Sequence, residues 1–188
     1  MSTLYSIGQM NQVADALEAA GYTPDDVTKL RSNADALKQF KFVLGGKSEI
    51  VKVKHIVDLD IDPFVPDYWE VVEHIKGGQF TFDPTKVVLY LDEVQKEAGV
   101  IVGNQLREKI KDRSAYNANL LDFYLKNPHL IPKEWKGKTV FFWGTIYRDS
   151  DGDLCVRFLK WRGYKWHWSF AWVGGCIYDS NPAAVPAK

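Results

Sequence analysis

The chain has few cysteines and no excess of charge of either sign. Each of these absences excludes a class of protein. Two cysteines, Cys155 and Cys176, among 188 residues are too few for the disulfide framework of a small secreted domain, so the fold must depend on its hydrophobic core. The 24 lysine and arginine residues balance 24 aspartate and glutamate residues. A chain without net positive charge matches the phosphate backbone poorly, so we expect no dedicated binding of nucleic acid.

Long apolar runs are also missing. No run approaches the roughly 18 residues that a membrane-spanning helix requires, and the residues from Met1 to Ser6 lack the basic and apolar regions of a signal peptide. We therefore expect no membrane span, while a cytoplasmic, a virion-associated and a surface-displayed location all stay open. With 46% hydrophobic residues, the chain has enough apolar side chains to bury a core.

Residues 1–85 are predicted to form an accessory lobe of helices and short strands. Thr23 is a typical N-cap and Pro24 a typical first helical residue. Apolar residues at helical spacing continue from there to Gly45. Residues 48–82 contain short β-rich runs that are broken by prolines and by a glycine pair. The domain boundary is expected at the end of this lobe.

Residues 86–188 are predicted to form an α+β domain. A continuous apolar run over 86–91 indicates a strand buried between neighbours. Apolar residues at helical spacing from Ile101 to Ile110 indicate a first helix, and Asn117 can cap a second one. Turns then separate three strands of an antiparallel meander, at 140–147, 154–161 and 165–173.

The last of these strands alternates between two kinds of side chain. Successive residues of a strand point to opposite faces of a sheet. One face therefore carries only aromatic rings, those of Trp166, Trp168, Phe170 and Trp172. The other face carries Lys165, His167, Ser169, Ala171 and Val173. Because large rings can anchor a core by themselves, we expect the aromatic face to be buried. The ordinary interpretation is a well-packed strand with a solvated outer face; the sharper one is a scaffold whose outer face varies freely.

Two stretches carry a resemblance to a known family. The segment LIPKEWKGKTVFFWGTIYR (130–148) and the ending WHWSFAW (166–172), closed by NPAAV (181–185), resemble the variable proteins of diversity-generating retroelements, which have a C-type-lectin fold. The resemblance implies a C-type-lectin-like domain over residues 86–188. It also implies a hypervariable ligand-binding protein of receptor or adhesion type rather than an enzyme. Its partner would be an unknown protein or cell-surface ligand, no cofactor is expected, and a homo-oligomer stays open.

In that family, copying errors at template adenines change the end of the gene, which implies a variable region over about residues 158–181. The expected fixed scaffold, encoded by tryptophan codons without adenine, is Trp161, Trp166, Trp168 and Trp172. The expected ligand-binding residues are Lys160, Arg162, Tyr164, His167, Ser169, Ala171, Gly174, Gly175, Cys176, Ile177, Tyr178, Asp179 and Ser180. Lys160 and Lys165 depart from the rule, because no change of adenine alone turns an asparagine codon into a lysine codon.

Two other functions stay open beside this one. An invariant aromatic module could bind carbohydrate or single-stranded nucleic acid by stacking, which requires exposed rings. An enzyme similar to formylglycine-generating enzymes would share the lectin-like fold, but that chemistry uses a paired-cysteine copper site. Cys155 and Cys176 lie in unrelated sequence contexts, so the sequence disfavours it.

Acidic clusters and histidines give no metal motif. The run from Asp149 to Asp153 is similar to a calcium loop, but its glycine, Gly152, stands at the fourth position and Lys160 stands where a bidentate glutamate belongs. A solvated hairpin turn is the favoured interpretation. The remaining candidates lack metal-ligand spacing and are expected to be surface or half-buried side chains: Asp58, Asp60, Asp62, His55, His74, His129 and His167.

Overall fold

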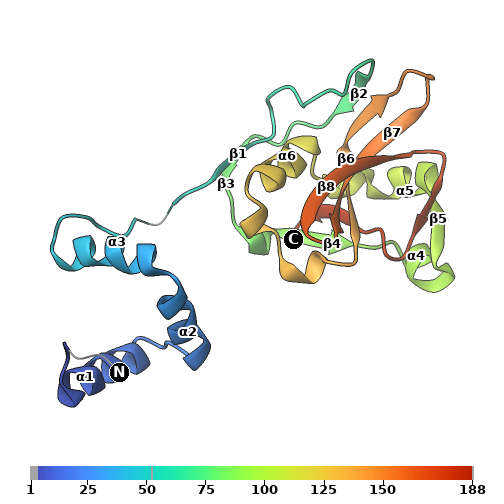
Figure 1. Ribbon diagram of the computed structural model, residues 1–188. Coiled ribbons are helices and arrows are strands. Elements are labelled where there is room, and N and C mark those ends of the chain that lie inside the picture. The colour runs from blue at the N-terminus through green and yellow to red at the C-terminus, as the bar shows by residue number, and fades with distance from the viewer. Residues whose placement is uncertain (1–3, 52, 188) are drawn as a thin grey trace. The chain divides into compact units, whose positions relative to one another are not determined.

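The computed structural model describes residues 4–51 and 53–187 (Figure 1). Contacts within the chain divide it into two compact units, Met1–Val53 and Lys54–Lys188. The division falls well before the expected boundary at residue 85. The expected lobe thus separates into a purely helical unit and a β-rich segment that belongs with the rest of the chain.

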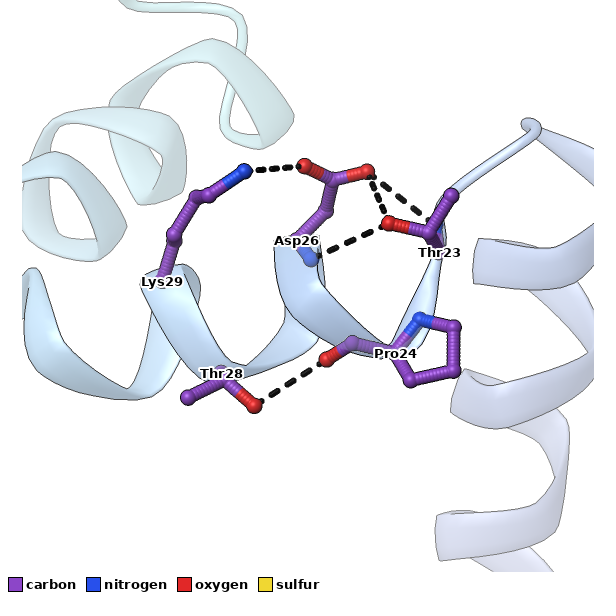
Figure 2. A network of polar contacts seen from close by, with 5 residues as sticks. All are labelled: Thr23, Pro24, Asp26, Thr28 and Lys29. Atoms are coloured by element: carbon purple, nitrogen blue, oxygen red, sulfur yellow. Dashed lines mark hydrogen bonds and ion pairs between the residues drawn. The ribbon is translucent and has the colours of Figure 1, made fainter.

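The described residues of the first unit form three helices, α1 (Ile7–Ala19), α2 (Pro24–Ser32) and α3 (Ala34–Leu44). The helix start predicted at Thr23 and Pro24 is confirmed. Figure 2 shows the capping box: Thr23 Oγ1 accepts a hydrogen bond from the Asp26 N–H at 3.3 Å, and the Asp26 carboxylate accepts one from the Thr23 N–H at 3.1 Å. These bonds satisfy donors that the first turn of a helix leaves without a partner.

The apolar stripe expected to run on to Gly45 does not form one helix. Asn33 has a φ of −122° and a ψ of 71°, which lie outside the helical region. Its side-chain oxygen accepts a hydrogen bond from the N–H of Ala36 at 3.0 Å. Asparagine competes in this way for backbone hydrogen bonds, so it ends α2 and caps α3.

The second unit is built around a six-stranded sheet with the strand order β4-β10-β6-β7-β8, in which β2 also pairs with β6. Its strands are β2 (Glu70–His74), β4 (Val87–Tyr90), β6 (Thr139–Arg148), β7 (Leu154–Arg162), β8 (Lys165–Trp172) and β10 (Ala183–Pro186). Two short pairs accompany it, β1 (Ile56–Asp58) with β3 (Gln79–Thr81) and β5 (Val100–Val102) with β9 (Cys176–Tyr178). The helices are α4 (Glu93–Ala98), α5 (Gly103–Ile110) and α6 (Ala118–Lys126), with short 3-10 turns at Pro84–Lys86, Lys111–Arg113, Pro128–Leu130 and Lys133–Trp135.

The predicted α+β class is confirmed, and so are the antiparallel meander β6-β7-β8 and the cap of α6 at Asn117. Two local expectations are wrong. The strand expected to be buried between neighbours, β4, pairs with β10 alone among the described strands, and Val87 is its one buried residue. Ile101 and Val102 lie in β5 rather than in a helix, because α5 begins at Gly103.

Residues 54–82 belong to the second unit because strand pairing and side chains join them to it. β2 pairs antiparallel with β6. The side-chain amide of Asn117 donates to the carbonyl oxygens of Leu59 and Ile75, each at 2.8 Å. One capping residue thus begins α6 and also holds the loops on either side of β2.

Two hydrophobic clusters lie on opposite faces of the main sheet. Alternate residues of β6 fall into different clusters: Val140 and Phe142 pack in the first, and Phe141 and Trp143 in the second. Helix α6 contributes to the first cluster and contacts β6, β7 and β8. Both faces of the central strand are therefore covered.

A buried ion pair joins α6 to the sheet. Arg157, in the middle of β7, is 1% exposed. Its two terminal nitrogens donate to the two carboxylate oxygens of Asp122 on α6, at 2.7 and 3.1 Å. The guanidinium also lies over the ring of Trp168 at 4.4 Å and near the ring of Phe64 at 5.2 Å. Three segments that are distant in the sequence meet at this one side chain.

We predict that Asp122→Ala destabilises the second unit by about 3–5 kcal/mol, because it leaves the Arg157 charge buried without its partner. Urea unfolding followed by tryptophan fluorescence measures this, since every tryptophan of the chain lies in the second unit. The control is Glu70→Ala, which removes an exposed ion pair to Arg148 at 2.8 Å and should cost about 0–1 kcal/mol. Equal effects of the two substitutions would contradict the prediction.

Candidate ligand-binding surface

Strand pairing sorts the residues of β8 onto two faces. Residues directly opposite one another in an antiparallel pair share a face. The aromatic face of β8 (Trp166, Trp168, Phe170 and Trp172) lies beside Trp161, Leu159, Arg157 and Cys155 of β7. The mixed face of β8 (His167, Ser169 and Ala171) lies beside Lys160, Phe158 and Val156. The alternation predicted from the sequence is confirmed.

The aromatic face is covered at one end only. Trp166 and Trp168 are half-buried and pack against the first hydrophobic cluster. Phe170 meets the ring of Trp69 edge-on at 4.8 Å yet remains partly exposed. Trp172 is 58% exposed, so its expected place in a buried scaffold is wrong. Trp172 pairs with Cys155, which follows the turn between β6 and β7. The first cluster does not extend to Trp172.

The mixed face is less open than expected. Strand β9 brings Ile177 into the second hydrophobic cluster, where Ala171 and Phe158 also pack. Ile177 is 1% exposed, so its expected role in ligand binding is wrong: it is a core residue. Ala171 is half-buried against the same cluster, to which β5 contributes Ile101 and α5 contributes Leu106 and Ile110.

One polar row crosses the mixed face and joins distant parts of the expected variable region. Lys160 pairs with His167 on one side and with Thr139 on the other. The N–H of Thr139 donates to the carbonyl of Ser180 at 3.0 Å. The sheet thus brings the β7–β8 hairpin and the segment after β9 together, which their separation in the sequence does not show.

The expected ligand-binding residues differ in exposure. The exposed ones are Lys160, Arg162, Tyr164, Gly174, Cys176, Tyr178, Asp179 and Ser180. The half-buried ones are His167, Ser169, Ala171 and Gly175, and Ile177 alone is buried. Of the expected scaffold, Trp161, Trp166 and Trp168 are half-buried. We call the eight exposed residues the display surface.

Two residues that the sequence analysis did not single out hold the segment around β9. Gln95, fully buried on α4, donates from its side chain to the carbonyl of Tyr178 at 2.9 Å. The N–H of Gly103 donates to the carbonyl of Gly175 at 2.9 Å. A Cβ atom at Gly103 would lie 2.5 Å from the carbonyl oxygen of Val173, so this close approach requires glycine. No local pattern around either residue signals these contacts.

The aspartates of the two acidic clusters accept hydrogen bonds from backbone N–H groups in turns. The Asp149 carboxylate accepts hydrogen bonds from the N–H groups of Asp151 and Asp153, at 3.1 and 2.9 Å, which confirms the predicted hairpin turn. Asp60 likewise accepts from Gly77 and Gly78. Across residues 4–51 and 53–187, no group of three or more His, Cys, Asp or Glu side chains could hold a metal ion.

The same described residues include no helix long and apolar enough to cross a membrane. Comparison with known proteins gives no match to a family model, to a curated protein or to a solved structure.

We predict that the two cysteines differ sharply in reactivity. Cys176 is exposed, whereas Cys155 is buried. Burial, with a smaller contribution from Asp149, raises the pKa of the Cys155 thiol to about 12, so it forms little of the reactive thiolate. Ellman's reagent should titrate one thiol rapidly in the folded chain and both in denaturant. Cys176→Ser should abolish the rapid phase; if the rapid phase persists in that variant, the assignment of the exposed thiol is wrong.

Proposed function

We propose that this chain is a hypervariable ligand-binding protein of receptor or adhesion type, diversified by a retroelement on a C-type-lectin-like scaffold. Its ligand would be a protein or another cell-surface molecule, bound without catalysis at the display surface. The observation that carries the proposal is the polar row together with the hydrogen bond from Thr139 to Ser180, which brings the two ends of the expected variable region close together at the start of β6.

The composition of the display surface also supports the proposal. Tyr164, Tyr178 and Arg162 are residue types that dominate the energy of protein interfaces, and Ser180 and Gly174 add the small polar and flexible positions typical of antibody-like surfaces. Substitution of exposed residues usually changes stability by less than about 0.5 kcal/mol. A surface of this kind can therefore vary while the two hydrophobic clusters below it stay intact.

The gene provides the direct test. The flanking DNA should contain a near-copy of the segment that encodes the variable region, differing from it at adenines, together with a reverse-transcriptase gene. Sequencing of the flanking DNA decides this. If it holds neither, diversification is ruled out and only an invariant binding surface remains.

Two neighbouring residues test the separation of surface from core. We predict that Tyr178→Ala, at a side chain that is 54% exposed, changes the free energy of unfolding by less than about 0.5 kcal/mol. Ile177→Ala should cost about 2–5 kcal/mol, because it leaves a cavity in the second cluster. Urea unfolding followed by tryptophan fluorescence measures both. A Tyr178→Ala variant as unstable as Ile177→Ala would show that the display surface cannot vary freely.

The exposure of Trp172 favours a second candidate, an invariant module that binds carbohydrate by ring stacking. That module would use the aromatic face rather than the display surface. Binding to an oligosaccharide panel that is lost in Trp172→Ala and kept in Tyr178→Ala would favour the second candidate, and the reverse result would favour the first.

A further inference from the structure

A pocket opens on the aromatic face of the main sheet, beside helix α6. Its volume of about 850 Å³ lies within the roughly 300–1,000 Å³ that is typical of small-molecule sites. Residues of β1, of the loop after β1 and of α6 line it, together with Arg157 of β7 and Trp168 of β8. Helix α6 contacts both β1 and β8 (Figure 1). We call this site the α6 pocket.

Three aromatic rings line the α6 pocket, those of Phe64, Phe123 and Trp168. The centroids of the Phe64 and Trp168 rings lie 5.9 Å apart, edge to face. The buried guanidinium of Arg157 lies over the Trp168 ring. Phe64 is exposed, and the other two rings are only half-buried. Part of their apolar surface is therefore accessible to a ligand.

Hydrogen bonds hold the loop between β1 and β2 in position around the pocket. The side-chain amide of Asn119, which is 8% exposed, donates to the carbonyl of Ile61 at 2.7 Å. The Tyr147 hydroxyl donates to the carbonyl of Phe64 at 3.1 Å. Because both bonds exist without a ligand, the pocket is preformed, which lowers the entropy cost of binding.

With His55 neutral, the charges that line the α6 pocket cancel. The charged lining residues are the acidic Asp58, Asp62 and Asp122 and the basic Lys54, Lys126 and Arg157. Arg157 and Asp122 bind each other. Asp62 and Lys126 have no side-chain partner among the described residues. The pocket thus offers a free acceptor and a free donor without a net charge, which favours neither a cation nor an anion.

We propose that the α6 pocket binds a neutral saccharide. A sugar ring has an apolar C–H face, which would pack on the aromatic rings. Its hydroxyl groups both donate and accept, so they would donate to Asp62 and accept from Lys126. A wholly apolar ligand would instead take water from these two side chains and return no hydrogen bond.

This inference goes beyond the proposed function and does not depend on it. The described residues that line the α6 pocket include none of the display surface. Trp168 is the one lining residue within the expected variable region, and it belongs to the expected fixed scaffold. The pocket would therefore stay constant while the display surface varies. It is also distinct from a site at Trp172, which does not line it.

Two adjacent residues provide a matched test. Phe64 lines the pocket and is 53% exposed, whereas Val65 does not line it and is 39% exposed. Isothermal titration calorimetry of the full chain with glucose, galactose, mannose, N-acetylglucosamine and lactose should detect binding of at least one sugar. Phe64→Ala should raise its dissociation constant about tenfold or more, because a packing ring is lost. Val65→Ala should leave it unchanged.

A second pair of variants tests the polar contact separately from the packing of Phe64. Lys126 and Lys133 are both exposed, and only Lys126 lines the pocket. Lys126→Ala should raise the dissociation constant of the same sugar about threefold to tenfold, the loss expected for one hydrogen bond. Lys133→Ala should not change it.

Several results would overturn the inference. Absence of binding across the sugar panel would do so, and so would equal effects of Phe64→Ala and Val65→Ala. Tighter binding of glucose 6-phosphate or of glucosamine than of glucose would show that the site prefers a charged ligand. Sugar binding that is lost in Trp172→Ala and kept in Phe64→Ala would place the sugar outside the pocket.

Tyr178→Ala separates the two sites, because it alters the display surface and should leave sugar binding in the α6 pocket unchanged. Failure of this inference is thus distinct from failure of the proposed function. An unchanged tryptophan emission spectrum in each variant shows that the second unit is still folded.

Discussion

The contact between Arg157 and Asp122 is the interaction on which the rest of the second unit depends. It is a bidentate ion pair that joins the centre of β7 to α6, and its guanidinium is buried. Such a pair adds little net stability compared with well-packed apolar side chains. Removal of one partner, however, is strongly destabilising, because it leaves a buried charge without its counter-charge. The ion pair therefore selects one position of α6 on the sheet, and the ring of Trp168 is held with it.

The consequences of that placement differ between the two faces of the sheet. On the aromatic face, the cover that accompanies α6 reaches Trp166 and Trp168 but does not extend to Trp172. On the mixed face, the second cluster provides the cover, with Ile101 of β5, Leu106 of α5 and Ile177 of β9 among its members. Each face is thus part core and part surface. The display surface lies at the β7–β8 hairpin and around β9, whereas the aromatic face becomes uncovered at the other end of β8, at Trp172.

The helical unit has well-defined local structure but no buried residue in its three helices. Its helices are well capped, by Ser6, Thr23 and Asn33, yet their apolar residues have no core to enter. Local hydrogen bonds determine where a helix begins and ends, but they cannot supply the burial that stabilises it.

The sequence by itself determined the features that depend on near neighbours. These are the capped start of α2, the start of α6 at Asn117, the meander and the alternation of β8. Each follows from turn chemistry, capping or the two-residue period of a strand, which act over a few residues. The same reasoning predicted one helix through Asn33 and a helix that included Ile101, because an apolar stripe alone does not show which backbone bonds are satisfied elsewhere.

Only the tertiary structure decided which residues of the alternating segment are accessible. Ile177 and Tyr178 are adjacent and were expected to act alike, yet one is core and the other surface. The difference arises because β9 pairs with β5 and lies against the second cluster, a contact with residues far away in the sequence. Trp168 and Trp172 also share one face of β8 but differ in exposure, because the first cluster packs against Trp168 and does not reach Trp172. The burial of a strand residue depends on which distant residues pack against it. The pattern of residues within the strand does not show which residues these are.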